Sequence, residues 1–360
     1  MSDATADALV ATLSDVVRST LPLDVLLESA ANDELPGKDQ LAGIVDLGWN
    51  GLWAFVGDDA PGAAVAADMF EVLGRGLVPS LLRDQAAVLA PLLSIAAERG
   101  DAGASVALRR LLAGAIAGGG VVVLPPGERF LEMNGDGTGR VTLEDALVTV
   151  GPDRSFAFVL NATGAALIEV PGEVSQAVTL ELGQGTCRLS GTFDVPAPRV
   201  FSPEEGRGSW HRWHLAVMSE LVGCASEILE RSVTHARTRE QFGRALSRFQ
   251  AVEHLLADMA VRVETARSAQ ARLVLLIQDE TQGDIEAYLA TLRHSLPVLV
   301  RSACENAIQI HGGTGYSWEQ GLHLWYRRVL QRQALFGGEV ATASLLGEQA
   351  LRRLSVGGSR

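Results

Sequence analysis

A cationic side chain, an aromatic ring and a side-chain amide occur close together in residues 236–260, ARTREQFGRALSRFQAVEHLLADMA. Arg239 precedes Phe242 by three residues, and Gln250 follows Phe242 by eight. A guanidinium group can pair bidentately with phosphate oxygens. A glutamine amide can both donate to and accept from a base edge or a phosphate. These residue types suit a ligand that carries a pyrophosphate.

A second stretch, residues 307–328, reads AIQIHGGTGYSWEQGLHLWYRR and offers the same kind of chemistry. Gln309 supplies another amide, and Gly312 and Gly313 follow it at the predicted end of a helix. Glycines carry no side chain, so their backbone N–H groups can come close to a ligand. His311 lies inside this turn and is a candidate for structural hydrogen bonding.

Both stretches resemble motifs of the acyl-CoA dehydrogenase family. The first is similar to its R-x-x-F-G loop with a glutamine eight residues after the phenylalanine, and the second to its Q-x-x-G-G-x-G-Y turn. Residues 41–55 and 69–79 resemble the helical opening segments of the family. The resemblance implies FAD as cofactor, held across a dimer interface by these groups of the neighbouring subunit. The residues that inherit this cofactor-binding role are Arg239, Gln241, Phe242, Gln250, Gln309, Gly312 and Gly313.

The catalytic base of the family is missing. The resemblance implies a glutamate that removes the α-proton of an acyl-CoA thioester while a hydride passes from the β-carbon to the flavin. Phe336 occupies the usual position of that glutamate, and a phenyl ring cannot accept a proton. Trp213 occupies the position that some members use instead, 26 residues before Arg239. Glu339, three residues after Phe336, is a candidate displaced base, or a carboxylate that favours the start of a helix.

The motif that holds the flavin ring is also missing. Family members carry a T-E-x-x-x-G-S-D-like segment there, and residues 117–130 read AGGGVVVLPPGERF instead. Gly338 replaces the threonine that follows the catalytic Glu-Gly in the family. The chain therefore keeps the half of the flavin site that is lent to a neighbour. We expect a subunit of a heteromer, α2β2, whose catalytic partner supplies the glutamate and the ring pocket.

Two other interpretations of the residues stay open. The chain could form a self-sufficient homomeric flavoprotein with a base such as Glu339, or a non-catalytic binding or scaffold protein on the same fold. Analogy with bacterial enzymes for bulky substrates suggests a steroid side-chain CoA thioester as the acyl-CoA substrate. The family resemblance implies an electron-transferring flavoprotein or similar carrier as the electron acceptor.

The elements that must position these residues form three zones. Residues 1–119 have helical spacing of Ala and Leu, and 206–360 contain long apolar stripes that predict an antiparallel four-helix bundle. Between them, residues 120–205 predict a small β-barrel or sandwich. The fold class is therefore α+β, of the acyl-CoA dehydrogenase type. The expected strands lie at 120–126, 140–150, 156–160, 165–170, 177–182 and 186–195.

Composition excludes several other classes. A net charge of −13 argues against nucleic acid as a partner. Three scattered cysteines and the absence of a signal-like N-terminus or a long apolar run predict a cytoplasmic protein without a membrane span. No histidine, cysteine or carboxylate spacing predicts a metal site. Residues 134–145 superficially resemble a calcium loop, but we expect a hairpin turn there.

Overall fold

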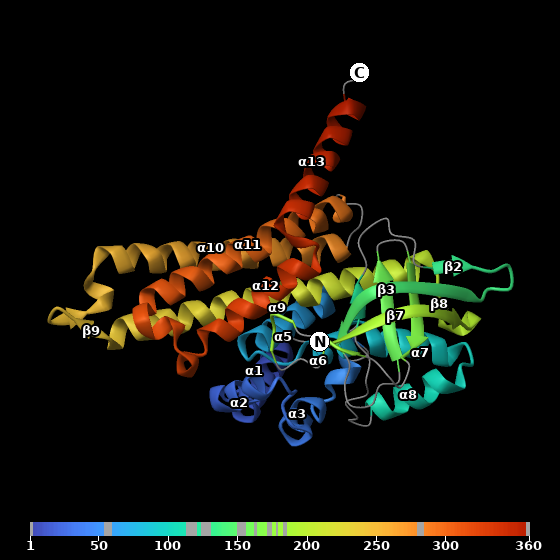
Figure 1. Ribbon diagram of the computed structural model, residues 1–360, viewed down its shortest axis with the longest axis horizontal. Coiled ribbons are helices and arrows are strands. Elements are labelled where there is room, and N and C mark those ends of the chain that lie inside the picture. The colour runs from blue at the N-terminus through green and yellow to red at the C-terminus, as the bar shows by residue number, and fades with distance from the viewer. Residues whose placement is uncertain are drawn as a thin grey trace. The chain divides into compact units, whose positions relative to one another are not determined.

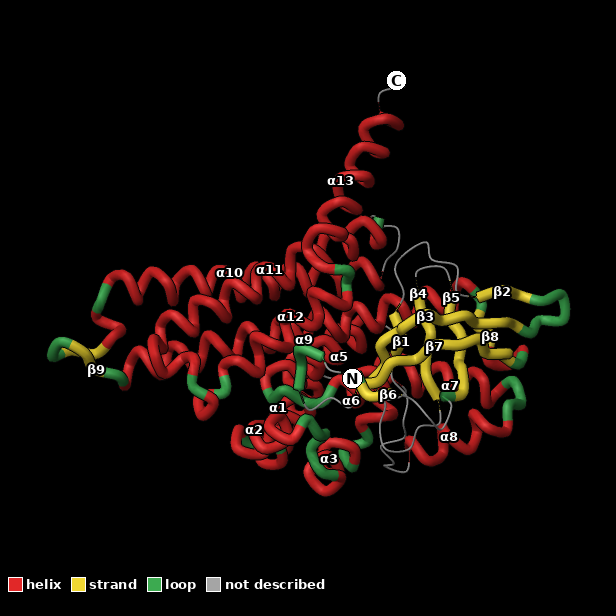
Figure 2. The backbone as a smooth tube through the Cα atoms, in the orientation of Figure 1, coloured by secondary structure: helices red, strands yellow, loops and turns green. Residues whose placement is uncertain are grey.

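The computed structural model forms two compact units (Figures 1 and 2). One comprises residues 1–69 and 78–216, the other residues 70–77 and 217–360. The structure describes residues 3–53, 60–112, 121–123, 131–149, 156–161, 164–170, 175–177, 179–182, 186–278 and 284–357. Most of the segment 117–130, which lacks the family's ring-binding motif, lies outside the described residues. The predicted domain boundaries at 119/120 and 205/206 stay a prediction.

The first unit begins with short helices, as the Ala/Leu pattern predicts. They are α1 (Asp3–Thr20), α2 (Leu23–Asn32), α3 (Lys38–Val45), α6 (Ser80–Asp84), α7 (Ala90–Glu98), α8 (Ala102–Leu112) and most of α5 (Ala60–Arg75). The stretch Ser80–Glu98 is continuously helical. Its length and apolar composition alone would allow it to cross a membrane. Within the structure, 78% of that window is buried, as in a core helix.

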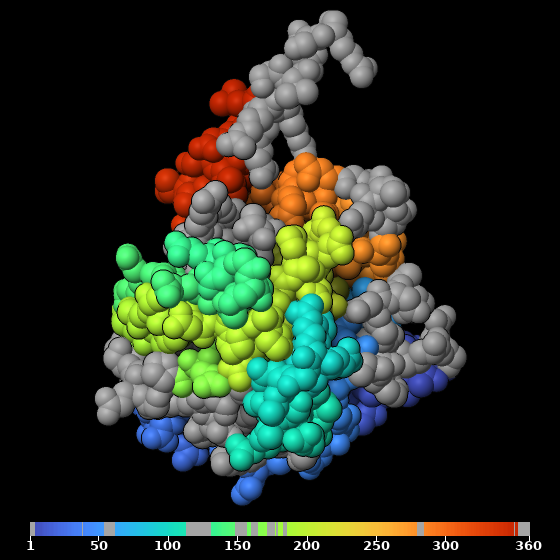
Figure 3. Space-filling view, turned by 90° about the vertical axis from the view of Figure 1, so that its right-hand side faces the viewer, coloured from blue at the N-terminus to red at the C-terminus, as the bar shows by residue number. Residues whose placement is uncertain are grey.

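Two four-stranded sheets follow in the same unit, with strand orders β1-β4-β5-β8 and β2-β3-β7-β6. Their facing apolar residues form one core that includes Val141, Leu189, Val159 and Ile168, which confirms the sandwich-like middle region. Figure 3 shows the outer surface of β3 and β7, with α8 below it in cyan. The strands are β1 (Val121–Val123), β2 (Leu131–Met133), β3 (Gly139–Thr149), β4 (Phe156–Asn161), β5 (Gly164–Glu169), β6 (Ser175–Gln176), β7 (Thr186–Val195) and β8 (Val200–Phe201).

One predicted strand is wrong. The described residues within 177–182 are not part of a strand, and β6 ends just before them. The hydroxyl of Thr179 donates to the carbonyl of Glu181 at 2.8 Å, so a local side-chain hydrogen bond replaces a ladder partner. The predicted hairpin turn is confirmed at residues 134–138, which join β2 to β3. The side chain of Asp136 accepts from the backbone N–H of Thr138 there.

The second unit is a bundle of long helices. They are α9 (Pro203–Thr238, residues 203–216 of which belong to the first unit), α10 (Gln250–Gln278), α11 (Ile285–His311), α12 (Leu322–Leu335) and α13 (Gly338–Gly357). Asp284 caps α11 by accepting from the backbone N–H of Ala287 at 3.0 Å. Pro297 lies inside α11, which continues through it to His311. The predicted end of α11 at Gly312 is confirmed, with φ +61° there.

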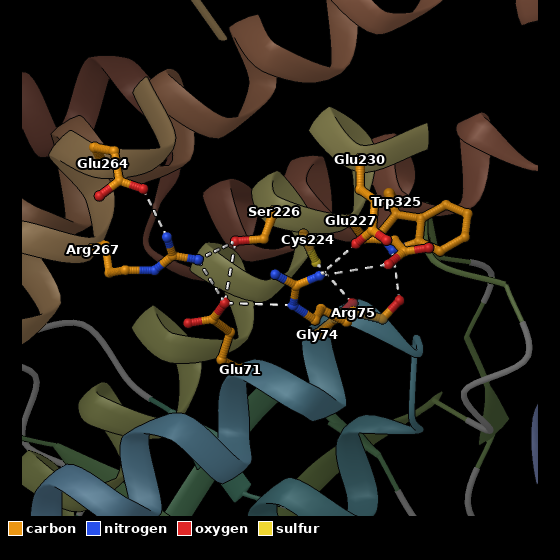
Figure 4. A network of polar contacts seen from close by, with 10 residues as sticks. All are labelled: Glu71, Gly74, Arg75, Cys224, Ser226, Glu227, Glu230, Glu264, Arg267 and Trp325. Carbon is orange, nitrogen blue, oxygen red and sulfur yellow. Dashed lines mark hydrogen bonds and ion pairs between the residues drawn. The ribbon is translucent and has the colours of Figure 1, made fainter. Parts of the chain in front are cut away.

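The end of α5 crosses α9 at two glycines in the second unit. A Cβ added at Gly74 would collide with the backbone carbonyl of Glu220, and one at Gly223 with the carbonyl of Glu71. Because neither residue has a side chain, the two helix backbones come into close contact. Polar groups flank the crossing (Figure 4): Arg267 of α10 donates to Glu71 at 3.0 Å and to Ser226 at 2.9 Å.

A buried ion-pair cluster joins α9 to α12. Glu220 is fully buried and accepts from Arg328 at 3.2 Å and from Arg332 at 2.8 Å. Arg328 also donates to the backbone carbonyl of Leu77 at 3.1 Å. The carboxylate thus ties helix α12 to α9 and to the segment that follows α5.

Candidate functional site

The loop after α9 presents Arg239 and Phe242 to solvent. Strands β9 (Glu240–Gln241) and β10 (Arg244–Ala245) form a tight hairpin, with Phe242 and Gly243 at its tip. Both tip residues have positive φ, +52° and +77°, as the two central residues of a type I′ turn require. Glycine adopts this conformation at no cost, whereas a phenylalanine at positive φ is strained. The turn holds the Phe242 ring 93% exposed.

The surroundings of the hairpin keep it ordered. The backbone N–H of Leu246 donates to the carbonyl of Arg239 at 2.9 Å, which closes the loop. The guanidinium carbon of Arg244 lies 4.0 Å from the ring centre of Phe249, and the Phe242 ring meets Phe249 edge-on at 6.3 Å. An exposed aromatic ring on a closed, strained turn is suited to contact another molecule.

The second motif forms the turn after α11. Gly312 and Gly313 are exposed, and a Cβ added to either would meet nothing within 4 Å. Gly315, by contrast, is buried against the backbone of Ile308, so it is required by packing. The open space beside the first two glycines leaves their backbone accessible, as a ligand-binding turn requires.

The predicted cofactor-binding residues share one property, exposure to solvent, and all belong to the second unit. They are Arg239, Gln241, Phe242, Gln250, Gln309, Gly312 and Gly313. No described cluster of histidine, cysteine or carboxylate groups could hold a metal ion. Sites that bind a cofactor within one subunit are usually concave and bury most of the ligand. These residues are instead placed where a neighbouring molecule can reach them.

A histidine pair connects the two motifs. The imidazole of His235, in the last turn of α9, stacks on that of His311 with ring centroids 4.1 Å apart and planes at 27°. The backbone N–H of Arg239 donates to the carbonyl of His235 at 2.8 Å, and His311 directly precedes Gly312. The structure therefore brings the Arg239 loop and the Gly312–Gly313 turn to one end of the second unit. The sequence around His235 gives no signal of this role, because a contact between two distant helices leaves no local pattern.

The two positions that the resemblance predicts for a catalytic base hold aromatic residues, and both are packed in the structure. Phe336 is partly buried at the end of α12, where its backbone N–H donates to the carbonyl of Arg332 at 3.2 Å. In the first unit, Trp213 is 1% exposed and stacks on Trp210, with ring centroids 6.2 Å apart. Neither side chain can accept a proton.

Glu339 lies in the first turn of α13 and is held by α11. Its Oε2 is 3.1 Å from Nη1 of Arg301 and accepts from the amide of Gln333 at 3.4 Å. The side chain is 48% exposed. His294 and Thr342, 3.1 Å apart, add a second contact between the same two helices. In this arrangement Glu339 anchors the start of α13.

This architecture, with N-terminal helices, a middle β region and a C-terminal helical domain, is that of the acyl-CoA dehydrogenases, so the expected fold class is confirmed. Butyryl-CoA dehydrogenase from Megasphaera elsdenii superposes with a TM-score of 0.72 at 17% identity, over 98% of this chain and 99% of that one. A variant of the Tcur3481-Tcur3483 steroid ACAD gives a TM-score of 0.75 at 18% identity, over 97% and 99%.

Sequence comparisons give the same result. The family model for the C-terminal domain of acyl-CoA dehydrogenases matches residues 209–351. Acyl-CoA dehydrogenase IpdE2 of Mycobacterium tuberculosis is 30% identical over 267 residues, which cover 74% of this chain and 71% of the relative. The probable acyl-CoA dehydrogenase YngJ of Bacillus subtilis is 36% identical over 31% of this chain and 29% of its own length. The chain belongs to the acyl-CoA dehydrogenase family, a family of flavoprotein oxidoreductases.

Proposed function

We propose that this chain is a subunit of an FAD-dependent acyl-CoA dehydrogenase and lends the adenine and pyrophosphate side of the flavin site to a catalytic partner subunit. The observation that carries the proposal is that the chain has the residues predicted for one half of the flavin site and lacks a base at the positions predicted for the other half. The motif residues of the lent half are present and exposed on the second unit. The base positions are filled by Phe336 and Trp213.

The lent half fits the chemistry of FAD. The pyrophosphate is doubly negative, and the exposed guanidinium of Arg239 can pair with it bidentately. The open backbone at Gly312 and Gly313 accommodates a closely approaching ligand. The strained, exposed ring of Phe242 offers a flat apolar surface to the dinucleotide. A related structure, PigA, is described with FAD and proline.

The remaining chemistry would come from the partner. When bound, the flavin supplies a hydride acceptor for α,β-dehydrogenation of an acyl-CoA thioester. Proton removal needs a base, which neither Phe336 nor Trp213 can provide. The ion pair with Arg301 gives Glu339 a structural role, so we assign the base to the partner subunit.

Exposed apolar surface supports an assembly. In the first two turns of α10, which begins at Gln250, the apolar residues Val252, Leu255 and Leu256 are only partly buried. On α13, Val340 is 81% and Leu351 68% exposed. Contiguous exposed apolar patches mark interaction sites, so we expect a partner subunit to cover these helix faces. We propose an α2β2 heterotetramer.

The relatives suggest the substrate class and the electron acceptor. One similar structure is described as a steroid ACAD, which supports a bulky, steroid side-chain thioester as substrate. Another relative is described as subunit CarC of the caffeyl-CoA reductase-Etf complex of Acetobacterium woodii, which supports an electron-transferring flavoprotein as acceptor. We place the enzyme in the cytoplasm.

The test is flavin content against native mass. The chain is purified alone, and then co-expressed with an acyl-CoA dehydrogenase-like partner encoded beside it. We expect a colourless protein alone and a yellow heterotetramer with one FAD per two chains. Full FAD loading of a homomer would instead favour the self-sufficient enzyme. Absence of flavin from every complex would favour a binding or scaffold protein.

A further inference from the structure

The contact between His235 and His311 joins two helix ends that are distant in sequence. His235 is partly buried near the end of α9, and His311, the last residue of α11, is 7% exposed. Their rings stack at 4.1 Å. Each histidine adjoins one predicted flavin motif in the chain, since the backbone carbonyl of His235 accepts from the N–H of Arg239 and His311 precedes Gly312. The stack therefore links the chain segments that carry the two motifs.

The surroundings of the pair favour neutral rings. Nδ1 of His311 lies 2.8 Å from the carbonyl of Ala307, so this nitrogen carries the hydrogen in the neutral ring. Among the described residues, the charged side chains that act on the titration of the pair are cationic: Arg239 beside His235 and Arg231 beside His311. Arg231 itself pairs with Glu227 at 2.8 Å. Protonation of either ring would add a positive charge next to another one.

The titration of both rings is shifted in the same direction. Burial lowers the pKa of His235 below 6.5, and His311 and Arg239 lower it further. Burial and Arg231 lower the pKa of His311, while its hydrogen bond to Ala307 offsets part of this effect. Because the folded-state pKa values are depressed, the stabilising contribution of neutral rings is complete above pH 6.5. It is lost as the pH falls from there through the lowered folded values.

We propose that His235 and His311 are positioning residues. Their neutral, stacked rings, here called the clasp, hold the Arg239 loop and the Gly312–Gly313 turn in a fixed position relative to each other, and the clasp opens on acidification. The clasp rests on the proposed function only for the identity of the ligand that the two motifs hold. Two stacked neutral imidazoles attract each other, whereas two imidazolium ions at this distance repel. Opening separates the two halves of the lent flavin site.

The experiment measures hydrogen exchange of the full chain at pH 7.5 and pH 5.5, corrected for intrinsic rates. We expect the segments 239–246 and 312–316 to lose protection together at the lower pH. His235→Ala removes the stack and should lower protection at both pH values. His235→Phe keeps an aromatic ring without the charge and should reduce the pH dependence. His254→Phe, at an exposed histidine of α10, is the matched control and should behave as the wild type.

Two results would overturn the clasp. One is equal protection of both segments at the two pH values. The other is a pH response that His235→Phe leaves unchanged. Flavin retention by the heteromer, measured at the same two pH values, separates this inference from the proposed function. Coupled, pH-dependent exchange without flavin in any assembly would leave the clasp standing and refute the proposed function. Flavin retention with no pH-dependent exchange would do the reverse.

Discussion

The carboxylate of Glu339 lies 3.1 Å from the guanidinium of Arg301, so the acidic residue three positions after Phe336 is paired with a cation. The pair joins the first turn of α13 to α11, beside the contact between His294 and Thr342. A carboxylate at the start of a helix is also favoured by the helix dipole. The ion pair therefore accounts for a glutamate at position 339 without a catalytic role.

Glu339→Gln should leave turnover of the heteromeric enzyme within about twofold of the wild type. The pair is half exposed, and exposed ion pairs contribute only about 0–1 kcal/mol. Steady-state rates with an acyl-CoA substrate check this prediction, and Glu348→Gln, on the exposed surface of the same helix, is the control. A loss of several orders of magnitude, for Glu339→Gln alone, would make Glu339 the base.

Arg239→Gln should weaken FAD binding by the heteromer at least about tenfold. Charge-assisted hydrogen bonds contribute roughly 1.5–3 kcal/mol, and a tenfold change in affinity equals about 1.4 kcal/mol. Fluorescence titration of the apo-heteromer with FAD measures the change. Arg237→Gln removes the same charge from an exposed position two residues away and should have little effect. Equal weakening by both substitutions would point to net charge instead of a specific contact.

Gly74→Ala and Gly223→Ala should each destabilise the second unit by about 1–3 kcal/mol or more, the usual cost of overpacking. The added methyl group meets a backbone carbonyl across the α5–α9 crossing, and this oxygen cannot move without shifting the helix. Chemical unfolding monitored by circular dichroism gives the change. Gly347→Ala in α13 meets nothing within 4 Å and should be neutral or stabilising by roughly 0.5–1 kcal/mol. Unfolding midpoints that match among the three variants would refute the close crossing.

Glu220→Gln should destabilise the fold by about 3–5 kcal/mol, because it removes the negative charge that faces two buried guanidinium groups. The control is Glu264→Gln, whose carboxylate is 69% exposed and pairs with Arg267 at 2.8 Å. We expect the control to change the free energy of unfolding by less than about 1 kcal/mol. If the two variants unfold at the same denaturant concentration, the buried cluster is not a major source of stability.

The sequence by itself determined the fold class and the residue types of the proposed half-site. Apolar stripes such as Trp213, Val217 and Leu221 are local patterns, and all three residues are buried in α9. The motifs around Arg239 and Gly312 depend on short spacings, so they could be recognised without coordinates. The strand expected at 177–182 failed because β propensity does not account for a competing side-chain hydrogen bond.

Only the tertiary structure decided which distant residues meet. The stack of His235 on His311, the packing of Gly74 against α9 and the pairing of Glu220 with Arg328 each join segments far apart in the chain. Such contacts depend on the angle and register at which helices cross, and many side chains together set these. A spacing of a few residues fixes the face of one helix, but it contains no information about the helix that packs against it.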